Sequence, residues 1–381
     1  MNDTKTISLC HTCYRHIPAE RITKNNAVYL NKTCPEHGHM EYLVETDVEF
    51  YNSLIYDKAG YTIPDGVLIE VTDKCNLNCP HCYHRPDNRT LDKPINIICS
   101  QVENRLHSDA GVVILAGAEP TVRKDLPELI TQIRNTLRKC NRKEDIAILT
   151  NGVKFSDRNW TRQIAEAGIT AVMIGMNHCS YQGKKIHEKQ LIGIDNCIKE
   201  GIFVYYVGYT LEHLDHMEEV LEEIQSLGNK SWQYRIRAGS DIGRSPDEPK
   251  FFLSRHVAKI KEICERKGWT WEKKTADDNL YHYMVNINGI PHRIIQWSDP
   301  KTIDLEQLQC GPWCDFVPGK PVTNFLHQIM LRDAVVNEGK LLHDTVPEKY
   351  MFKPNDVKEY ELTKWTYKSQ KDFKEKQLST I

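Results

Sequence analysis

Three cysteines with the spacing C-x3-C-x2-C, Cys75, Cys79 and Cys82, constrain this chain more than any other feature. They follow an apolar, extended run at 67–71, so the sequence predicts a loop that leaves the end of a strand. Such a loop can wrap three thiolates around one iron-sulfur cube. A cube normally takes four cysteine thiolates, so three leave one iron open to another ligand. The alternatives are a zinc site, which needs a fourth ligand and usually has C-x2-C pairs, and three unrelated thiols.

A second metal-like pattern lies near the N-terminus. Cys10 and Cys13 form one pair, and Cys34 and His37 form another about twenty residues later, with a short strand expected at 27–30 between them. Two such pairs predict a zinc ribbon in which four ligands converge on a closed, structural zinc site. A single iron of the rubredoxin type is the alternative, although the histidine favours zinc. A module this small needs its metal to fold, and it could also serve as a nucleic-acid contact or a substrate lid.

The charge balance gives the chain no general attraction to nucleic acid or to an anionic membrane, because 50 basic side chains stand against 52 acidic ones. A small, near-neutral substrate molecule is therefore expected rather than nucleic acid. Thirteen cysteines, several in metal-like spacings, favour reduced thiols over disulfides. We find no signal-peptide pattern and no apolar run of about 18 residues. The expected protein is cytoplasmic, with no membrane partner.

The middle of the chain alternates between strand and helix patterns, which predicts βα units and a parallel sheet. Strands are expected near 67–71, 112–116, 146–150, 171–176, 203–208 and 233–238. Helices are expected near 95–108, 124–139, 157–167, 188–200 and 212–227. The fold class is therefore α/β, with a partial (β/α)6 barrel over 60–245 that follows the zinc-ribbon module of 1–50. Chemistry in such barrels gathers at the C-terminal ends of the strands.

Residues 246–381 depart from this rhythm and predict an α+β extension that caps the barrel and selects substrate. A helix is expected near 252–267 and another near 321–337. A hairpin over 281–297 is indicated by its Asn-Gly turn. Cys310 and Cys314 could be buried thiols, ligands of a second metal centre, or reactive thiols in catalysis.

The loops after the second and third strands carry candidate ligand-binding residues. In Gly117-Ala118-Glu119-Pro120, glycine lets the backbone approach a ligand, and the carboxylate can accept a hydrogen bond from a ligand ammonium group. Asn151 ends the third strand in a turn dipeptide, and a plain loop is the alternative there.

Two arginines on the sixth strand are a further candidate site. Arg235 and Arg237 lie on one face because side chains alternate along a strand. Guanidinium groups on a barrel strand are costly to bury unless they meet an anion, so one of them is expected to pair with an acidic group of a ligand. The alternative is an edge strand with both arginines in water.

The cysteine loop resembles that of the radical S-adenosylmethionine (SAM) enzymes. The resemblance implies a 4Fe-4S cluster on Cys75, Cys79 and Cys82, whose open iron binds SAM. One electron from the cluster then cleaves SAM to a 5′-deoxyadenosyl radical. The loop at Glu119 is similar to the family's G-G-E-P motif, with Ala118 in place of the second glycine. The SAM-binding residues implied by the resemblance are Tyr83, Gly117, Ala118, Glu119, Pro120, Asn151, Arg235 and Arg237.

The order of ribbon, acidic linker and cysteine loop narrows this resemblance further. It is similar to the tetraether lipid synthase and hydroxymethylpterin methyltransferase-like group of radical SAM proteins. Residues 38–74 lack the additional cysteines of its lipid-coupling members. The resemblance therefore implies methylation or carbon-carbon bond formation on a small polar or heterocyclic molecule, with a one-electron donor such as flavodoxin or ferredoxin as partner. Oxidation or rearrangement of a peptide, sugar or nucleotide is an alternative. A nucleic-acid adaptor with a structural iron-sulfur site, and an electron carrier, are alternatives from other classes.

Overall fold

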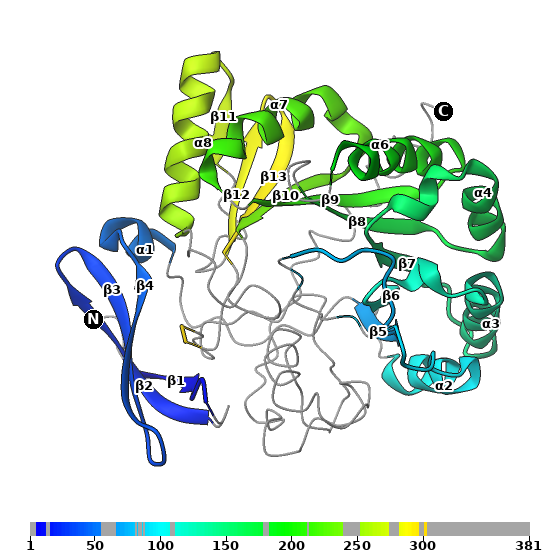
Figure 1. Cartoon of the computed structure of the whole chain (residues 1–381), viewed down its shortest axis with the longest axis horizontal. Coiled ribbons are helices and arrows are strands. Elements are labelled where there is room, and N and C mark those ends of the chain that lie inside the picture. The colour runs from blue at the N-terminus through cyan, green and yellow to red at the C-terminus, as the bar shows by residue number, and fades with distance from the viewer. Residues whose placement is uncertain are drawn as a thin grey trace.

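The computed structural model describes residues 5–12, 16–54, 66–80, 82, 86, 88–106, 111–177, 183–211, 213–238, 252–273, 282–296 and 301–302. These residues form a four-stranded sheet near the N-terminus and a nine-stranded sheet over the rest (Figure 1). The predicted helix near 321–337 lies outside the described residues.

The N-terminal sheet is antiparallel in the order β1-β2-β3-β4. Its elements are β1 (Lys5–Leu9), β2 (His16–Lys24), β3 (Ala27–Cys34) and β4 (Gly38–Glu45), followed by helix α1 (Val48–Leu54). Asn25 and Asn26 join β2 to β3 with φ of 51° and 59°. Both asparagines thus take the left-handed conformation that a two-residue hairpin turn requires. The sequence predicted only one short strand in this region, so the module is more regular than expected.

The large sheet contains all six strands predicted from the strand-helix rhythm. They are β5 (Gly66–Thr72), β6 (Val112–Gly117), β7 (Asp145–Thr150), β8 (Ala171–Asn177), β9 (Phe203–Leu211) and β10 (Gln233–Ala238). Neighbours in this order pair in parallel. Continuous apolar runs such as Ile146–Ile148 produce these strands because a parallel sheet is buried on both faces. The α/β fold class is confirmed.

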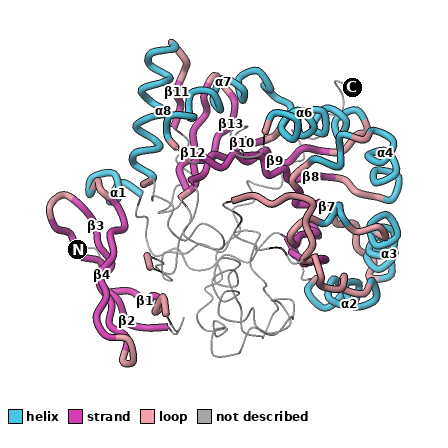
Figure 2. The backbone as a smooth tube through the Cα atoms, viewed as in Figure 1, coloured by secondary structure: helices cyan, strands magenta, loops and turns pink. Residues whose placement is uncertain are grey.

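Helices lie along the outer side of this sheet (Figures 1 and 2). They are α2 (Ile95–Arg105), α3 (Leu126–Lys139), α4 (Arg158–Ala167), α6 (Lys184–Lys199), α7 (Met217–Leu227) and α8 (Leu253–Lys267). Short 3-10 turns are η1 (Pro120–Val122), η2 (Val153–Ser156), η3 (Leu214–His216) and η4 (Gly228–Lys230). Helix α4 illustrates the local signals: the Asp157 side chain accepts from the Trp160 backbone amide at its start, and Gly168, at φ 112°, ends it.

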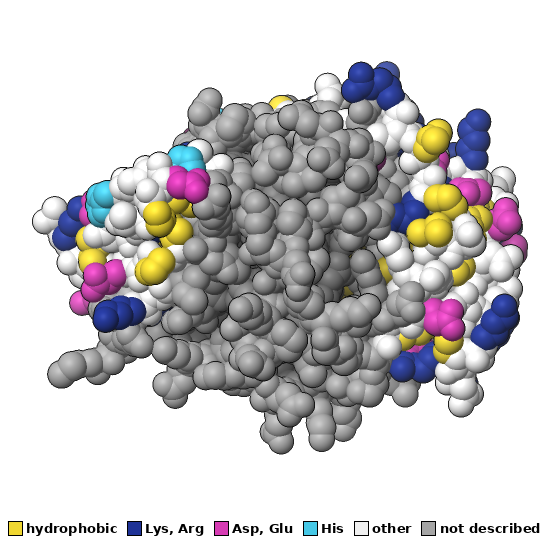
Figure 3. All heavy atoms as spheres, turned by 90° about the horizontal axis from the view of Figure 1, so that it is seen from below, with side chains coloured by type: hydrophobic (Ala, Val, Ile, Leu, Met, Phe, Trp, Pro, Cys, Tyr) yellow, Lys and Arg dark blue, Asp and Glu magenta, His cyan; other side chains and the backbone are white. Residues whose placement is uncertain are grey.

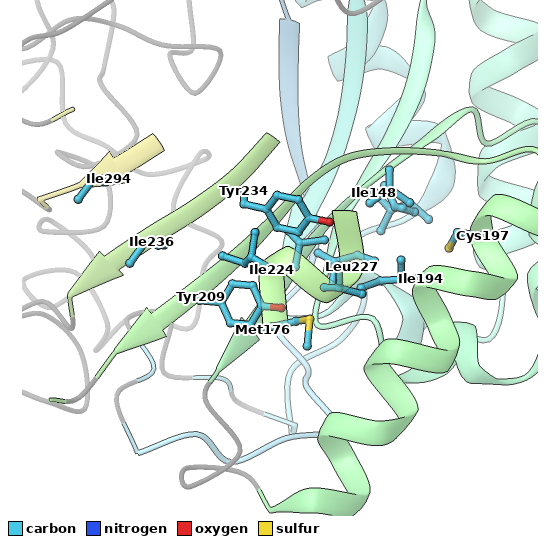
Figure 4. Close-up of a cluster of buried hydrophobic side chains, with 14 of the residues drawn as sticks. Ile148, Met176, Ile194, Cys197, Tyr209, Ile224, Leu227, Tyr234, Ile236 and Ile294 are labelled. Atoms are coloured by element: carbon cyan, nitrogen blue, oxygen red, sulfur yellow. The ribbon is translucent and has the colours of Figure 1, made fainter. Parts of the chain in front are cut away.

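The core lies between the sheet and these helices. In Figure 4, Met176, Tyr209 and Tyr234 of the strands meet Ile194 and Ile224 of the helices. All of them are buried. The alternate strand residues therefore face away from the helices, onto what we call the inner face of the sheet. The candidate site residues of β10, Arg235 and Arg237, lie on this inner face.

Three further strands extend the sheet beyond β10. They are β11 (Trp271–Lys273), β12 (His282–Ile287) and β13 (Ile290–Ile295), and β12 and β13 form the predicted hairpin around Asn288 and Gly289. Strand β13 pairs in parallel with β10. Strand β10 is therefore internal, and the alternative of an edge strand with both arginines in water is wrong: only 6% of Arg235 is exposed.

The N-terminal module packs against the end of the large sheet that lies opposite β5. The Glu45 carboxylate accepts from the Ser254 hydroxyl (2.6 Å) and backbone amide (3.2 Å), which joins the end of β4 to the start of α8. Phe50 of α1 stacks on Tyr283 of β12, with ring centroids 5.9 Å apart. No helix in the described part of the chain has the length and apolar character needed to cross a membrane.

Candidate cofactor and metal sites

The cysteine loop leaves β5 at its C-terminal end, as predicted. Cys75, Cys79 and Cys82 are all partly buried. Burial raises the pKa of the Cys75 thiol to about 12, and negative charges on Glu119, Cys82 and Cys79 add to the rise. The backbone amide of Cys82 donates to the Cys79 carbonyl at 3.4 Å, so a turn joins these two cysteines. The backbone amide of Leu77 donates to Cys75 Sγ at 3.3 Å, a contact that suits a cluster-bound sulfur.

Polar contacts fix both ends of this loop. Thr72 Oγ1 and Lys74 Nζ donate to Asp92, at 2.6 Å and 3.1 Å, and the Cys75 amide donates to Asn88 Oδ1 at 2.9 Å. Burial opposes ionisation of Asp92, but the bonds from Thr72 and Lys74 lower its pKa overall. The loop is therefore held to the segment that follows it before any metal binds.

Arg123 is a buried anchor for the same region. Its guanidinium group donates to the backbone carbonyls of Val71 (2.7 Å) and Lys93 (2.8 Å) and pairs with Asp125. It joins the end of β5, the segment before α2 and the start of α3. No local sequence pattern indicates this role, because the three partners are far apart in the chain.

The loop after β6 lies directly against the end of β5. Gly117 has φ 131°, and a Cβ on it would lie 2.3 Å from the Thr72 carbonyl oxygen. Only glycine fits this approach. The Ala118 amide donates to that carbonyl at 3.0 Å, and the Glu119 amide donates to the carbonyl of Lys74 at 2.9 Å. The two loops are therefore one hydrogen-bonded unit, and the methyl group of Ala118 is accommodated in it.

Glu119 is 1% exposed, and its carboxylate accepts four hydrogen bonds from this chain. The amide and hydroxyl of Thr121 (3.1 and 2.6 Å) and the hydroxyl of Thr150 (2.7 Å) reach Oε1. The Asn151 amide reaches Oε2 at 2.6 Å. Burial raises the pKa of Glu119, and these bonds oppose the rise. The carboxylate therefore joins the loops after β6 and β7, a contact that the sequence did not predict.

Asn151 extends this network to the cysteine loop. Its Nδ2 donates to Asn76 Oδ1 at 2.8 Å, and its Oδ1 accepts from the Val153 amide at 3.1 Å. Gln190 of α6 donates to the Asn151 carbonyl at 2.6 Å. The structure thus brings Asn151, Glu119 and the cysteine loop together at one edge of the sheet.

Asn177, at the end of β8, contacts the same loop. Its Nδ2 lies 3.7 Å from Cys79 Sγ, with the geometry of an N–H···S hydrogen bond. The two residues are 98 positions apart in the chain, so no local sequence pattern predicts this contact. Residues 178–182 and Tyr83 lie outside the described residues.

The two arginines of β10 lie on the inner face. Arg235 Nε donates to Gln233 Oε1 at 3.0 Å, and its guanidinium carbon lies 3.7 Å from the ring centroid of Tyr206. Arg237 Nε donates to Thr210 Oγ1 at 2.8 Å. None of these contact partners belongs to the cysteine loop. Their role as ligand-binding residues stays a prediction.

The N-terminal sheet brings three of its four predicted metal ligands together. Cys10 Sγ and Cys34 Sγ lie 3.6 and 3.4 Å from His37 Nδ1. The ligand atoms of this trio lie within 4.8 Å of one another. Zinc bonds of about 2.3 Å to sulfur and 2.0 Å to nitrogen, arranged tetrahedrally, separate these atoms by about 3.6 Å. The trio therefore fits zinc.

Cys13, which is predicted to be the fourth ligand, lies outside the described residues, as do Cys310 and Cys314. His11 is close to the trio, but its Nδ1 lies 2.9 Å from the Tyr42 hydroxyl. The hydrogen bond from His37 lowers the pKa of the Cys34 thiol, which favours the thiolate that a metal requires.

Comparison with known families identifies two domains. Residues 69–231 match the Radical SAM superfamily, and residues 3–46 match the HMPTM N-terminal zinc ribbon domain. The chain therefore carries a radical SAM domain. This domain follows a zinc ribbon of the HMPTM type, so the group predicted from the sequence is confirmed.

The chain is similar to several curated proteins. It is 28% identical over 235 residues to the 7,8-dihydro-6-hydroxymethylpterin dimethyltransferase of Methanocaldococcus jannaschii, which covers 52% of this chain and 45% of that protein. It is 31% identical over 137 residues to a probable GTP 3′,8-cyclase of Methanococcus aeolicus, covering 35% and 43%. The matches thus span less than half of either relative.

Among solved structures, Streptococcus suis SuiB bound to its precursor peptide SuiA has a TM-score of 0.44 at 10% identity, covering 77% of this chain and 73% of that one. On the face shown in Figure 3, the charges of the described residues are mixed. Lys, Arg, Asp and Glu side chains intermingle over the described parts of the face in Figure 3.

Proposed function

We propose that the protein is a radical SAM enzyme that acts on a small polar or heterocyclic substrate by C-methylation or carbon-carbon bond formation. The observation that carries this proposal is the joining of three loops at one edge of the sheet. The cysteine loop, the loop of Glu119 and the loop of Asn151 are hydrogen-bonded to one another. These are the segments in which the sequence resembles the SAM site of the superfamily.

Cys75, Cys79 and Cys82 would hold a 4Fe-4S cluster. Two of these sulfurs accept hydrogen bonds, Cys75 Sγ from the Leu77 amide and Cys79 Sγ from Asn177 Nδ2. These contacts support the fit of the cysteines to a cluster. Such N–H···S contacts balance the negative charge of a cluster-bound thiolate. When bound, the cluster supplies one electron for the reductive cleavage of SAM, and the resulting radical removes hydrogen from the substrate.

The residues around the cysteines would orient SAM and exclude water. Gly117, Ala118 and Pro120 shape the loop whose backbone would approach SAM. Glu119 holds this loop in place through its four hydrogen bonds, so we assign it a positioning role in addition to the predicted SAM contact. Asn151 would position SAM from the neighbouring strand end. The protein thus contributes orientation, and the cofactor contributes the reactivity.

Cys10, Cys13, Cys34 and His37 would hold a structural zinc ion. The ribbon packs through α1 and Glu45 on α8 and β12, far along the sheet from β5. A structural role for the metal fits this position.

A one-electron donor such as flavodoxin or ferredoxin would reduce the cluster.

The reaction type is supported by similarity. One relative is named as a dimethyltransferase of a hydroxymethylpterin, and another as a GTP 3′,8-cyclase. Both names describe a small heterocyclic substrate. A ring-forming reaction on a nucleotide is the second candidate, favoured by the match to the cyclase.

The test is anaerobic turnover. Reconstituted, dithionite-reduced protein with SAM is expected to form 5′-deoxyadenosine, and Cys79→Ala is expected to form none. With SAM labelled in its methyl group and a cell extract as substrate source, a labelled product would support methylation. An active cluster that forms 5′-deoxyadenosine but yields only unlabelled product would favour the second candidate. Absence of 5′-deoxyadenosine, with salt-sensitive RNA or DNA binding instead, would support a nucleic-acid adaptor.

A further inference from the structure

A buried glutamine of α6 ties the ends of β7 and β8 together. Gln190 is fully buried, and α6 lies on the outer side of the sheet (Figure 1). Its Nε2 donates to the carbonyl of Asn151 at 2.6 Å and to the carbonyl of Gly175 at 3.3 Å. Asn151 directly follows β7, and Gly175 lies two residues before Asn177, the last residue of β8. One side-chain amide therefore holds two neighbouring strand ends to the same helix.

Both of these strand ends send an asparagine side chain to the cysteine loop. Asn151 Nδ2 donates to Asn76 Oδ1 at 2.8 Å, and Asn177 Nδ2 lies 3.7 Å from Cys79 Sγ. The two bonds of Gln190 thus lead to the cysteine loop through two asparagines, one at each strand end.

The orientation of Asn151 is set by separate contacts to its polar groups. Its amide donates to Glu119 Oε2 at 2.6 Å, its carbonyl accepts from Gln190, and its Oδ1 accepts from the Val153 amide at 3.1 Å. These contacts direct Nδ2 toward Asn76. Without the donor from Gln190, the Asn151 carbonyl loses its bond to α6, and the residue is held against the cysteine loop less firmly.

Two further residues of α6 hold the rest of the loop that begins at Asn151. Asn196 is 6% exposed, and its Nδ2 donates to the carbonyls of Phe155 at 2.9 Å and Ser156 at 3.1 Å. A Cβ on Gly193 would lie 2.7 Å from the carbonyl oxygen of the loop's second residue, so only glycine permits this approach. The helix and the loop therefore form one packed unit, in which the bonds of Asn196 lie four and five residues after Asn151.

We propose that Gln190 is a positioning residue of the SAM site, which sets Asn151 and Asn177 against the cysteine loop. This inference rests on the proposed function, in which Asn151 orients SAM, and adds a residue that acts on the site through others. An N–H dipole at Cys79 Sγ stabilises the reduced cluster. Both the affinity for SAM and the reduction potential of the cluster therefore depend on Gln190.

The test compares Gln190→Met with Asn196→Leu in the full, anaerobically reconstituted chain. Each substitution removes a buried amide of α6 that bonds two backbone carbonyls, and each keeps the approximate size of the side chain. Gln190→Met is expected to weaken SAM binding at least tenfold and to make the cluster potential more negative, measured by equilibrium binding and by a redox titration followed by EPR. Asn196→Leu is expected to lower Tm by a similar amount, to keep SAM affinity within twofold of wild type and to leave the potential unchanged.

Two additional variants support this comparison. Gln190→Glu keeps the shape of the side chain but replaces the donor by an acceptor, so it should give the same losses and serves if Gln190→Met does not fold. Asn151→Ala removes the side chain through which Gln190 acts. Adding Gln190→Met to Asn151→Ala should therefore weaken SAM binding by less than a further twofold.

Two results would overturn the proposal. One is an equal loss of SAM affinity in Gln190→Met and Asn196→Leu, which would follow from a less stable loop alone. The other is a folded Gln190→Met protein with the SAM affinity and cluster potential of wild type. Formation of 5′-deoxyadenosine by wild-type protein shows separately whether the proposed function holds, because it does not depend on the comparison of variants.

Discussion

Replacing Glu119 by glutamine tests whether its carboxylate holds the SAM-site loops together. The carboxylate has three donors at Oε1 and one, the Asn151 amide, at Oε2. Glutamine has one acceptor oxygen and one NH2 group. If the glutamine oxygen accepts from Thr121 and Thr150, the glutamine NH2 group takes the place of Glu119 Oε2. In the wild-type protein that oxygen lies 2.6 Å from the Asn151 backbone nitrogen. A donor would then face a donor.

The lost bond gives the size of the effect. A hydrogen bond to a charged group contributes about 1.5–3 kcal/mol, and the facing donors add to its loss. For a domain of this size, 1 kcal/mol corresponds to about 2–4 °C in Tm. We therefore expect Glu119→Gln to lower Tm by about 4–10 °C and to weaken SAM binding as well, because the loop of Gly117 loses its tie to the loop of Asn151.

The assays are differential scanning calorimetry and equilibrium binding of SAM to reconstituted protein. The matched control is Glu103→Gln, at an exposed position of α2, which should change neither quantity. Thr150→Val removes one donor and should give a smaller loss of the same kind. Removal of a buried charge can stabilise a protein when its bonds contribute little. Unchanged or raised Tm together with lost SAM binding would refute the positioning role and leave Glu119 as a direct SAM ligand only.

Three other perturbations address separate parts of the account. Cys34→Ser should remove the bound zinc and unfold the ribbon, measured by metal analysis and by loss of the first thermal transition; retention of one zinc per chain would contradict the ligand assignment. Asn177→Leu should make the cluster potential more negative, because an N–H dipole at Cys79 Sγ stabilises the reduced cluster; an unchanged potential in a redox titration followed by EPR would count against that contact. His292 is fully buried, and burial lowers its pKa to about 4. As the pH falls from about 6.5 to 4, the His292 imidazole therefore becomes protonated in the unfolded chain before it does so in the folded one. Stability should therefore fall by about 2 kcal/mol between pH 7 and 5, and His292→Gln should flatten this dependence in denaturant titrations.

Local sequence patterns were sufficient to predict the six parallel strands β5 to β10, the hairpin of β12 and β13 and most helices, but not β1, β2, β4 and β11. Parallel strands such as β6 and β7 are continuous apolar runs, and their ends are marked by Gly117 and by Asn151-Gly152. The positions of the cysteine loop and of Glu119 follow from these strand ends, because the carboxyl ends of parallel strands share one edge. Three of the four predicted ribbon ligands, Cys10, Cys34 and His37, lie together in the structure, and Cys34 and His37 are close because they lie three residues apart.

Contacts between distant segments were not predictable. Arg235 and Arg293 are neighbours only because β13 returns parallel to β10 after a hairpin, and no local signal sets that order. The hydrogen bond from Ser254 to Glu45 spans 209 residues. Thr150 and Thr121 are ordinary threonines in the sequence, and their role at Glu119 follows from the approach of two loops. The sequence therefore predicted which loops could form a site but not the contacts that join these loops.

The central claim is that three protein sulfurs hold the cluster and leave one iron for SAM. Electron-nuclear double resonance on the reduced cluster, with SAM labelled with 15N in its amino group and 17O in its carboxylate, tests this claim most directly. The account predicts coupling of both nuclei to the cluster in wild-type protein. SAM that binds without either coupling, on a cluster whose four irons all have protein ligands, would contradict it.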